Sequence, residues 1–216
     1  MYWNSVMAFY NYYFYFLLFI LISYIPLIFL SEKFMKKRDP INIKNSIFIW
    51  NISLGIYSAY CVRNITLPLL RNDLFLYKDS ICTDIIASNN IILAKWRFYF
   101  VMSKFPEMID TAWIIMRKKK LTLLHVWHHF SVCLYCWIIV YSTYYNEGGH
   151  GTYFAAMNSF IHMLMYSYYA IVTKTSFRSN LIAKLITTLQ IIQMMCGLLI
   201  HLYKSFNCNC NYMIEV

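Results

Sequence analysis

The chain has 216 residues, of which 60% are hydrophobic, 19% are aromatic and only 13% are charged. A soluble domain carries about 25% charged residues, so this composition excludes an ordinary soluble protein and indicates a membrane protein. The net charge of +10 does not point to nucleic acid as a partner, because the basic residues alternate between loops in the way that sets membrane topology.

Six apolar stretches are near the length of about 20 residues that an α-helix needs to cross a bilayer. They are residues 9–30, 46–62, 96–116, 124–143, 152–172 and 181–203. The first lacks the basic start and the small-residue cleavage site of a secretory signal, so we interpret it as a retained span. No repeat, soluble domain or long linker is visible in the sequence. These features predict an all-α polytopic membrane protein with one domain over residues 1–216.

Basic residues are grouped in every second loop. They follow the first span (Lys33, Lys36, Lys37, Arg38, Lys44), the third (Arg117 to Lys120) and the fifth (Lys174, Arg178, Lys184). By the positive-inside rule these three loops are cytosolic, which places the N-terminus and residues 145–151 on the lumenal side. The lumen of the endoplasmic reticulum is oxidising. We therefore expect Cys82 to bridge to Cys208 or Cys210 on the same side, two pairings that the sequence leaves open.

The third predicted span carries charged and polar residues at helical spacing. Lys104, Glu107 and Thr111 share one face by the i, i+3, i+7 rule, and Asp110 lies beside them. Charges in a membrane are costly alone, so Lys104 is expected to pair with Glu107 or Asp110. An isolated ion pair of this kind is more often structural than catalytic. Pro106 cannot donate the backbone hydrogen bond of the preceding turn, which predicts a kink or a new helix start.

The most informative stretch places three imidazoles within five residues of the fourth predicted span, at His125, His128 and His129. At helical spacing their side chains fall within a sector of about 100°, so one cavity can be lined by all three. Titratable groups inside a membrane segment are costly to desolvate and face the protein interior or a water-filled cavity. The cluster therefore predicts a functional site.

The fifth and sixth predicted spans add polar faces of their own. The residues concerned are Asn158, His162, Tyr166 and Tyr169 in the fifth span and Thr187, Gln190 and Gln193 in the sixth. Each set alone has a structural interpretation, since amides in membrane helices often hydrogen-bond across helix interfaces. Four spans carry such faces together, however, and packing alone does not require so many desolvated polar groups. We therefore predict one shared site.

In this order the residues resemble the four signature motifs of the ELO fatty-acid elongases. The motifs are Lys104-Phe-Pro-Glu107-Met-Ile-Asp110-Thr111, His125-Val-Trp-His128-His129, Asn158-Ser-Phe-Ile-His162-Met-Leu-Met165-Tyr166-Ser-Tyr168-Tyr169 and Thr187-Thr-Leu-Gln190-Ile-Ile-Gln193. The resemblance covers about residues 20–205. A single HxxHH pattern is shared with other membrane enzymes, whereas four ordered motifs on predicted spans are specific.

The resemblance implies a condensing enzyme of the endoplasmic reticulum membrane that joins a long-chain acyl-CoA to malonyl-CoA and releases 3-oxoacyl-CoA, CO2 and CoA. It implies no cofactor and no metal. The partners that it implies are membrane lipid and the ketoreductase, dehydratase and enoyl reductase of the elongation cycle, and it leaves a homodimer open. The family fold has seven spans, with an acyl tunnel whose CoA end opens to the cytosol. We see six spans before Val216 and expect the seventh helix and the cytosolic tail to be missing.

The resemblance and the chemistry together assign roles. The enzyme must activate the acyl group and stabilise the enolate that forms as malonyl-CoA loses CO2. We predict that His128 attacks the thioester to form an acyl-imidazole. His125 and His129 would orient groups and relay protons, and His162 would stabilise or protonate the enolate. The predicted substrate-binding residues are Lys104, Glu107, Asp110, Asn158, Tyr166, Tyr169, Gln190 and Gln193.

Three other interpretations each account for part of the pattern. Cys133 or Cys136 could be the nucleophile, as in soluble ketosynthases, but Cys136 lies about 12 Å further along the helix than His128. A di-iron desaturase or hydroxylase also uses HxxHH boxes, but it needs more histidine ligands than the six in this chain. A non-enzymatic transporter or scaffold subunit explains buried polar faces but not the spacing of the motifs.

Overall fold

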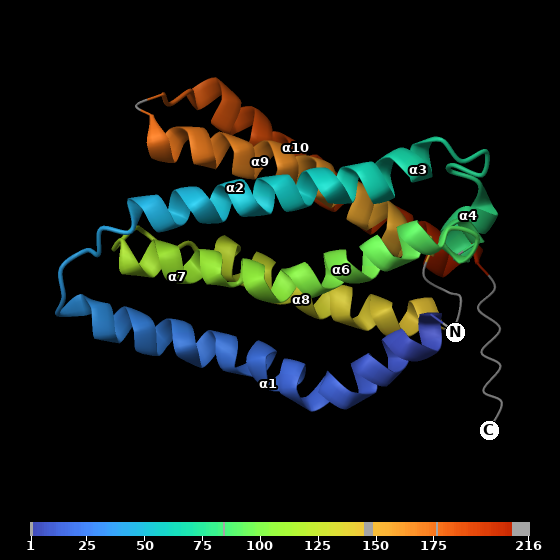
Figure 1. Ribbon diagram of the computed structural model, residues 1–216, viewed down its shortest axis with the longest axis horizontal. Helices are drawn as coiled ribbons and strands as arrows, with labels where there is room; N and C mark the ends of the chain where they lie inside the picture. Colours follow the sequence, from blue (N-terminus) through green and yellow to red (C-terminus); the bar gives the residue numbers. More distant parts are fainter. Residues whose placement is uncertain (1, 84, 145–148, 176, 209–216) are drawn as a thin grey trace.

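The computed structural model describes residues 2–83, 85–144, 149–175 and 177–208, and within these ranges all regular structure is helical. The long helices lie roughly along the longest axis of the molecule (Figure 1). They are α1 (Tyr2–Lys36), α2 (Lys44–Cys61), α6 (Ile91–Glu107), α8 (Leu123–Tyr144), α9 (Gly149–Lys174) and α10 (Asn180–Asn207). Shorter helices are α3 (Leu67–Leu70), α4 (Lys78–Cys82), α5 (Ile85–Ser88) and α7 (Ile109–Met116). The predicted all-α class is confirmed for the described residues.

Two helices have both the length and the hydropathy of a membrane span, namely α1 over Ala8–Lys36 and α10 over Asn180–Asn207. The other four predicted spans coincide with α2, with α6 followed by α7, with α8 and with α9. The chain thus has the helices that the sequence predicted. The count of six spans and the acyl tunnel stay predictions.

The predicted break at Pro106 is present. Helix α6 ends at Glu107 and α7 begins at Ile109, because Pro106 has no N–H to donate to the preceding turn. The backbone closes the gap with a tighter turn, in which Met108 N donates to Phe105 O at 3.2 Å. The charged residues of this span therefore belong to two successive helices.

Helical structure continues after α2 beyond residue 62, where the second span was expected to end. A π-helical turn, η1 (Val62–Thr66), joins it to α3, which ends at Leu70. Pro68 accounts for the widened turn, since it offers no N–H to the carbonyl group one turn before it, and π-turns absorb such mismatches inside helices. The helical region is therefore longer than the sequence predicted.

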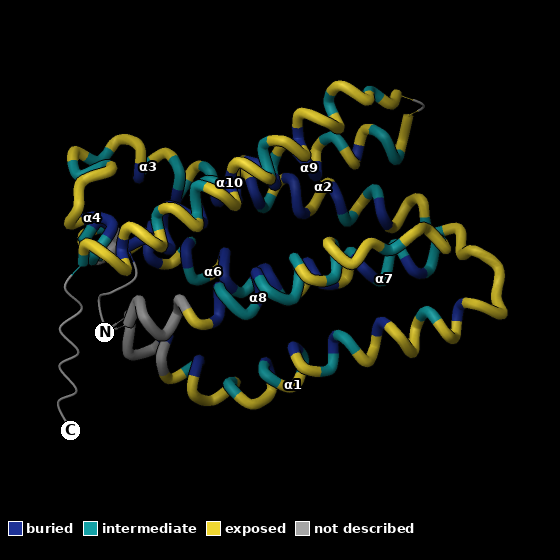
Figure 2. The backbone as a smooth tube through the Cα atoms, turned by 180° about the vertical axis from the view of Figure 1, so that it is seen from behind, coloured by how far each residue is buried: buried dark blue, intermediate teal, exposed yellow. Residues whose placement is uncertain are grey.

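Helix α9 lies at the centre of the bundle. It packs against α2, α10, η1, α6 and α8, and most of its first ten residues are buried. Helix α1 contacts α7 and α8, and the outward faces of α1 and α10 are largely exposed (Figure 2). Exposed apolar helix faces of this kind are what a membrane-spanning bundle presents to lipid.

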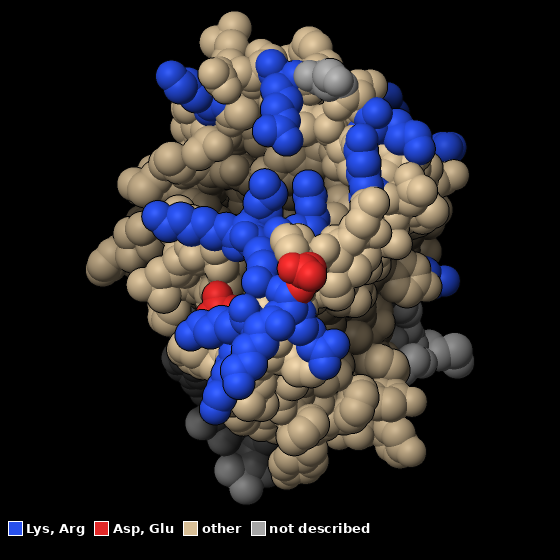
Figure 3. Space-filling model, turned by 90° about the vertical axis from the view of Figure 1, so that its left-hand side faces the viewer, with Lys and Arg blue, Asp and Glu red and all other residues tan. Residues whose placement is uncertain are grey.

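The three basic loops lie at one end of the molecule, where α1 joins α2, α7 joins α8 and α9 joins α10 (Figure 1). Figure 3 views this end and shows Lys and Arg side chains gathered across it, with few acidic ones between them. The exposed members include Lys36, Lys37, Arg38, Lys44, Lys118, Lys119, Lys120, Lys174 and Arg178. This clustering is what the positive-inside interpretation requires.

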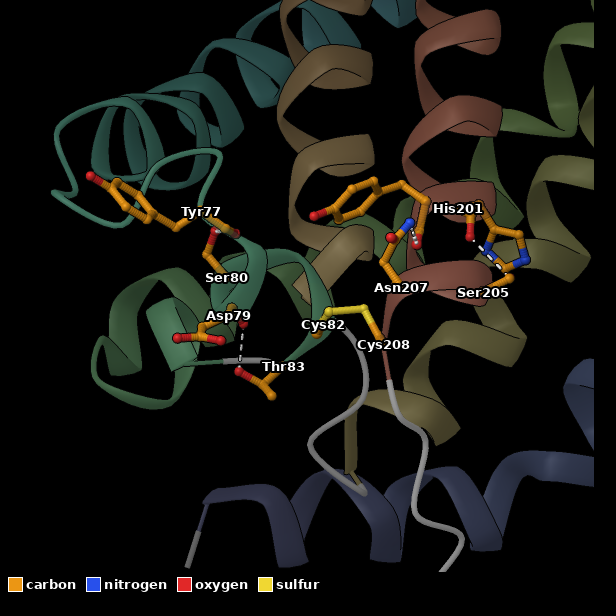
Figure 4. The surroundings of a disulfide bond; sticks show 10 residues. Tyr77, Asp79, Ser80, Cys82, Thr83, His201, Ser205, Asn207 and Cys208 are labelled. Carbon is orange, nitrogen blue, oxygen red and sulfur yellow. Dashed lines mark hydrogen bonds between the residues drawn. A yellow bond between two sulfur atoms is a disulfide. The ribbon is translucent and has the colours of Figure 1, made fainter.

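The opposite end is closed by a disulfide between Cys82 of α4 and Cys208 at the end of α10, whose Cα atoms are 5.5 Å apart (Figure 4). The predicted bridge of Cys82 is confirmed with Cys208 as the partner. The alternative partner, Cys210, lies outside the described residues. A local hydrogen bond lies next to each cysteine. Thr83 Oγ1 donates to the carbonyl oxygen of Asp79 beside Cys82, and Asn207 Nδ2 donates to the carbonyl oxygen of Tyr203 beside Cys208.

Candidate active site

A buried ion pair on α6 is the first part of the site. Lys104 Nζ donates to both carboxylate oxygens of Glu107, at 2.7 and 2.8 Å. Ser103 Oγ adds a third hydrogen bond, 2.9 Å from Glu107 Oε1. All three residues are buried, and a buried charge is tolerated only where a partner and hydrogen bonds compensate its desolvation. The expected partner of Lys104 is thus Glu107 rather than Asp110.

Asn158 joins this pair to α9 and α10. Its Oδ1 accepts from Lys104 Nζ at 3.0 Å, and its Nδ2 lies 3.2 Å from His162 Nε2 and 3.3 Å from Gln193 Oε1. An amide nitrogen has two hydrogens to donate, so both are used, and His162 Nε2 must be the acceptor. The His162 hydrogen is then on Nδ1, which lies 3.6 Å from Glu107 Oε2. Five predicted site residues, namely Lys104, Glu107, Asn158, His162 and Gln193, thus form one network.

A pocket lies over the ion pair. It is lined by Lys104, Glu107, Asn158 and His162, together with Tyr57, Ser58, Cys61, Phe100, Ser103 and Ser159. The side chains close it so tightly that no water molecule fits at its centre. Residues predicted on two different spans are therefore brought to one place, in a closed arrangement.

Helix α2 contributes three residues to this pocket that sequence reasoning did not assign to the site. Tyr57, Ser58 and Cys61 line it, and Ser58 and Cys61 belong to a buried stripe that begins at Ile47. The sequence does contain a pattern that could have identified this face, because these residues recur at three- and four-residue intervals and so lie on one side of a helix. The pattern does not stand out, because most positions on both the inward and the outward face of this span are apolar.

Asp110 lies apart from the pocket, between two helices. Its Oδ1 accepts from Trp50 Nε1 at 2.6 Å, and its Oδ2 accepts from Tyr166 OH at 2.7 Å. Both carboxylate oxygens are thus engaged by donors from α2 and α9. This geometry suits a clamp that fixes α7 between its neighbours, and the predicted substrate contact of Asp110 and Tyr166 stays a prediction.

The three histidines of the HxxHH pattern, His125, His128 and His129, lie together on the first turns of α8. The ring centroids of His125 and His129 are 4.4 Å apart, and those of His128 and His129 are 5.7 Å apart. Nε2 of His125 is 3.0 Å from Thr111 Oγ1. The His128 side chain makes no hydrogen bond within the described ranges, so its imidazole is free to meet a substrate.

The histidine cluster lies near the buried network without lining the same pocket. His128 lies on α8, which packs against α6 and α9, the helices that carry Lys104, Glu107 and His162. His128 is not among the pocket residues. The expected convergence of His128 and His162 on one cavity therefore stays a prediction.

Two predicted substrate-binding residues lie outside this arrangement. The Tyr169 side chain is 44% exposed, on the outer side of α9. Gln190 Nε2 points to Met165 Sδ, at 3.1 Å, and so helps to join α10 to α9. Neither residue lines the pocket.

The cysteines of α8 are placed as apolar core residues. Cys133 and Cys136 are both buried among hydrophobic side chains, in two different clusters, and neither lines the pocket. Within the part of the chain that the structure describes, no group of three His, Cys, Asp or Glu side chains is close enough to hold a metal ion. The polar groups that line the pocket are imidazole, amine, carboxylate, amide, hydroxyl and thiol groups.

Comparison with known proteins gives consistent matches. The sequence model described as "ELO: GNS1/SUR4 family" matches residues 3–216. The chain is 36% identical over 198 residues to "Very long chain fatty acid elongase 4" of Trypanosoma cruzi, in an alignment that covers 86% of this chain and 65% of that protein. It is 36% identical over 193 residues to "Very long chain fatty acid elongase 6" of Mus musculus, covering 85% and 67%. For "Putative fatty acid elongase 3" of Caenorhabditis elegans the identity is 34% over 182 residues, covering 83% and 55%. The chain thus spans about two thirds or less of the length of these relatives.

Proposed function

We propose a function from the premise that this chain belongs to the ELO (GNS1/SUR4) family. The proposed reaction is the condensation of a long-chain acyl-CoA with malonyl-CoA, which gives a 3-oxoacyl-CoA, CO2 and free CoA. The supporting observation is the free imidazole of His128. It lies on α8, which packs against the two helices that hold a buried network of a cation, a carboxylate and a second imidazole.

In the first half-reaction, the bare ring nitrogen of neutral His128 attacks the thioester carbonyl carbon. A nitrogen–carbon bond forms as the carbon–sulfur bond breaks, and the product is an acyl-imidazole. The departing CoA thiolate takes the proton that the His128 ring loses. His129, whose ring centroid is 5.7 Å from that of His128, is the neighbouring imidazole that can pass this proton.

In the second half-reaction, malonyl-CoA loses CO2 and its carbon–carbon bonding electrons become an enolate. The enolate carbon attacks the acyl carbonyl, the nitrogen–carbon bond to His128 breaks, and the ring takes up a proton from solvent. His162 and Asn158 are the candidate donors to the enolate oxygen. The two side chains contact each other in the closed pocket. Opening this contact would free an Asn158 amide hydrogen, and His162 would donate its Nδ1 hydrogen, which lies beside Glu107 in the closed pocket.

The position of the histidines along the chain supports a CoA site at the basic end. His125 lies in the first turn of α8, directly after the basic loop from Arg117 to Lys120. A thioester held near His128 would therefore place the CoA phosphates close to exposed lysines, which attract polyanions. The acyl chain would extend between the helices toward the disulfide end, in the proposed tunnel.

The setting proposed for this reaction is the endoplasmic reticulum membrane, which six helical spans would cross. The two long apolar helices and the exposed apolar faces support a membrane location. The ketoreductase, dehydratase and enoyl reductase of the elongation cycle would consume the product. The family match favours elongation over the desaturase, hydroxylase, transporter and scaffold alternatives, for which the described residues offer no specific support.

Membranes that carry the protein, incubated with radiolabelled malonyl-CoA and a panel of acyl-CoA lengths, test the proposal. We expect labelled 3-oxoacyl-CoA that depends on both substrates, and none from His128→Ala membranes. His201→Ala, which changes an exposed histidine at the far end of α10, is the matched control and should retain activity. Equal labelling in wild-type and His128→Ala membranes would overturn the proposed reaction.

A further inference from the structure

A chain of hydrogen bonds connects α1 to the histidine cluster. Tyr24 OH of α1 lies 2.6 Å from Thr111 Oγ1 of α7, and Thr111 Oγ1 lies 3.0 Å from His125 Nε2 of α8. Thr111 is only 1% exposed and Tyr24 only 7%. Helix α1 packs against both α7 and α8. The two hydroxyl groups are therefore largely removed from water, and His125 is partly buried beside them.

The direction of these hydrogen bonds follows from counting donors. Thr111 has one hydroxyl hydrogen, so it can donate either to Tyr24 or to His125. If Thr111 donated to Tyr24, the buried Tyr24 hydroxyl hydrogen would have no acceptor, because this hydroxyl makes no other hydrogen bond in the described ranges. A buried donor without an acceptor is costly. The favoured arrangement runs from Tyr24 to Thr111 and from Thr111 to His125.

We propose that Tyr24 and Thr111 are positioning residues that hold His125 in one tautomer. Thr111 donates to Nε2 of His125, so Nε2 carries the lone pair and the ring hydrogen is on Nδ1. A hydrogen bond to one ring nitrogen sets the tautomer and what the other nitrogen can do. His125 then presents a fixed N–H donor to the cluster, whose nearest ring is His129 at 4.4 Å between centroids.

This inference narrows the chemistry of His125 and, for its catalytic consequence, rests on the proposed function. With Nε2 occupied, His125 cannot serve as a base at that nitrogen. It can only orient a neighbouring imidazole or a substrate oxygen through Nδ1–H. The hydroxyl of Thr111, and behind it that of Tyr24, would thus act on the reaction without touching the substrate.

Nitrogen-15 solid-state NMR of histidine-labelled protein reads the tautomer directly, with His125→Gln used to assign the His125 signals. At a pH of about 8, above the ordinary His pKa of about 6.5, Nε2 of wild-type His125 should give the signal of a bare, hydrogen-bonded nitrogen. Thr111→Val should move the hydrogen to Nε2 for a large share of molecules, and Thr111→Ser should keep the wild-type tautomer. A hydrogen on Nε2 in the wild type, or no change in Thr111→Val, would overturn the proposal.

Tyr24→Phe tests the outer part of the chain. It removes the hydroxyl that fixes the direction of the Thr111 hydrogen, so both tautomers of His125 should be populated. Tyr12→Phe, on an exposed position of the same helix, and Thr175→Val, at an exposed threonine beyond α9, should leave the tautomer unchanged. An unaltered His125 signal in Tyr24→Phe would mean that Tyr24 does not help to fix the tautomer of His125.

Activity separates this proposal from the proposed function. Thr111→Val should lower the turnover of condensation by about tenfold, the scale of one lost orienting hydrogen bond, while the KM for acyl-CoA stays near wild type and Thr111→Ser recovers turnover. If the tautomer responds as expected but the wild type forms no 3-oxoacyl-CoA, only the proposed function fails. If the wild type is active and the tautomer does not respond, only the positioning proposal fails.

Discussion

Lys104 and Glu107 face each other one turn apart on α6, with Nζ 2.7 Å from Oε1 and exposures of only 3% and 5%. Neither charge has enough contact with water to replace its partner. The pair also carries the contacts to Asn158 and His162. Its integrity therefore decides both the stability of α6 and the shape of the pocket.

Breaking this pair from either side should destabilise the protein strongly. Lys104→Met and Glu107→Gln should each lower the free energy of unfolding by about 3–5 kcal/mol, because each leaves a buried charge or polar group uncompensated. The double variant should lose less than the sum of the two. Thermal unfolding in detergent gives the comparison, with Lys95→Met, an exposed lysine on the same helix, as a control without effect. Additive losses would mean that the two charges do not depend on each other.

Replacing the two proposed catalytic histidines should have different effects on the half-reactions. With acyl-CoA alone, the wild type should release at most one equivalent of CoA, and mass spectrometry should find the acyl group on the peptide that contains His128. His128→Ala should show neither, while His162→Ala should still form some acyl-enzyme but lose condensation. CoA release that requires malonyl-CoA would instead indicate direct attack in a ternary complex, with His128 acting as an acid and base.

The clamp on Asp110 should contribute measurably to stability. Trp50→Phe and Tyr166→Phe each remove the donor to one carboxylate oxygen, and each should cost about 1–3 kcal/mol because a part-buried acceptor is left unsatisfied. Tyr60→Phe, at a tyrosine that is 50% exposed, should unfold at the wild-type temperature. If both clamp variants behaved like Tyr60→Phe, the Asp110 contacts would not hold the helices together.

Gly149 should tolerate no side chain. A Cβ atom built there would collide with the backbone carbonyl oxygens of Thr83 and Ser80, whereas one at Gly55 would meet only ordinary contacts of 3.6 Å or more. Gly149→Ala should therefore destabilise the protein by about 1–3 kcal/mol or more, because backbone atoms cannot move aside as a flexible side chain can. Gly55→Ala is the matched control and should change the unfolding temperature little. Equal unfolding temperatures for the two variants would contradict the close approach of α4 to α9.

Sequence reasoning predicted what depends on spacing within one helix. A partner for Lys104 at Glu107 or Asp110 was expected from their spacing, and the structure has Glu107; the break between α6 and α7 follows from Pro106. The bridge of Cys82 followed from charge topology, which placed it on the same side as Cys208. Each of these predictions depends only on the geometry within one helix or on the side of the membrane where a residue is expected to lie.

Sequence reasoning missed what depends on how helices are rotated against one another. Cys61 lines the pocket because α2 turns that face toward α9, and nothing in an almost wholly apolar span fixes this rotation. Tyr24 is one of 20 tyrosines, and only the packing of α1 on α7 distinguishes it. The same holds for Trp50, whose contact with Asp110 joins residues 60 positions apart.

The Cys82–Cys208 bridge also orders the events of biosynthesis. The two cysteines are 126 residues apart, so a ribosome finishes the first of them long before the second exists. Cys82 therefore cannot form this bond while α6, α8 and α9 are being made. The bond can close only when α10 lies beside α4, so a chain that carries it is one whose synthesis is complete through α10. Pulse-labelled protein on a non-reducing gel would accordingly separate nascent molecules from assembled ones.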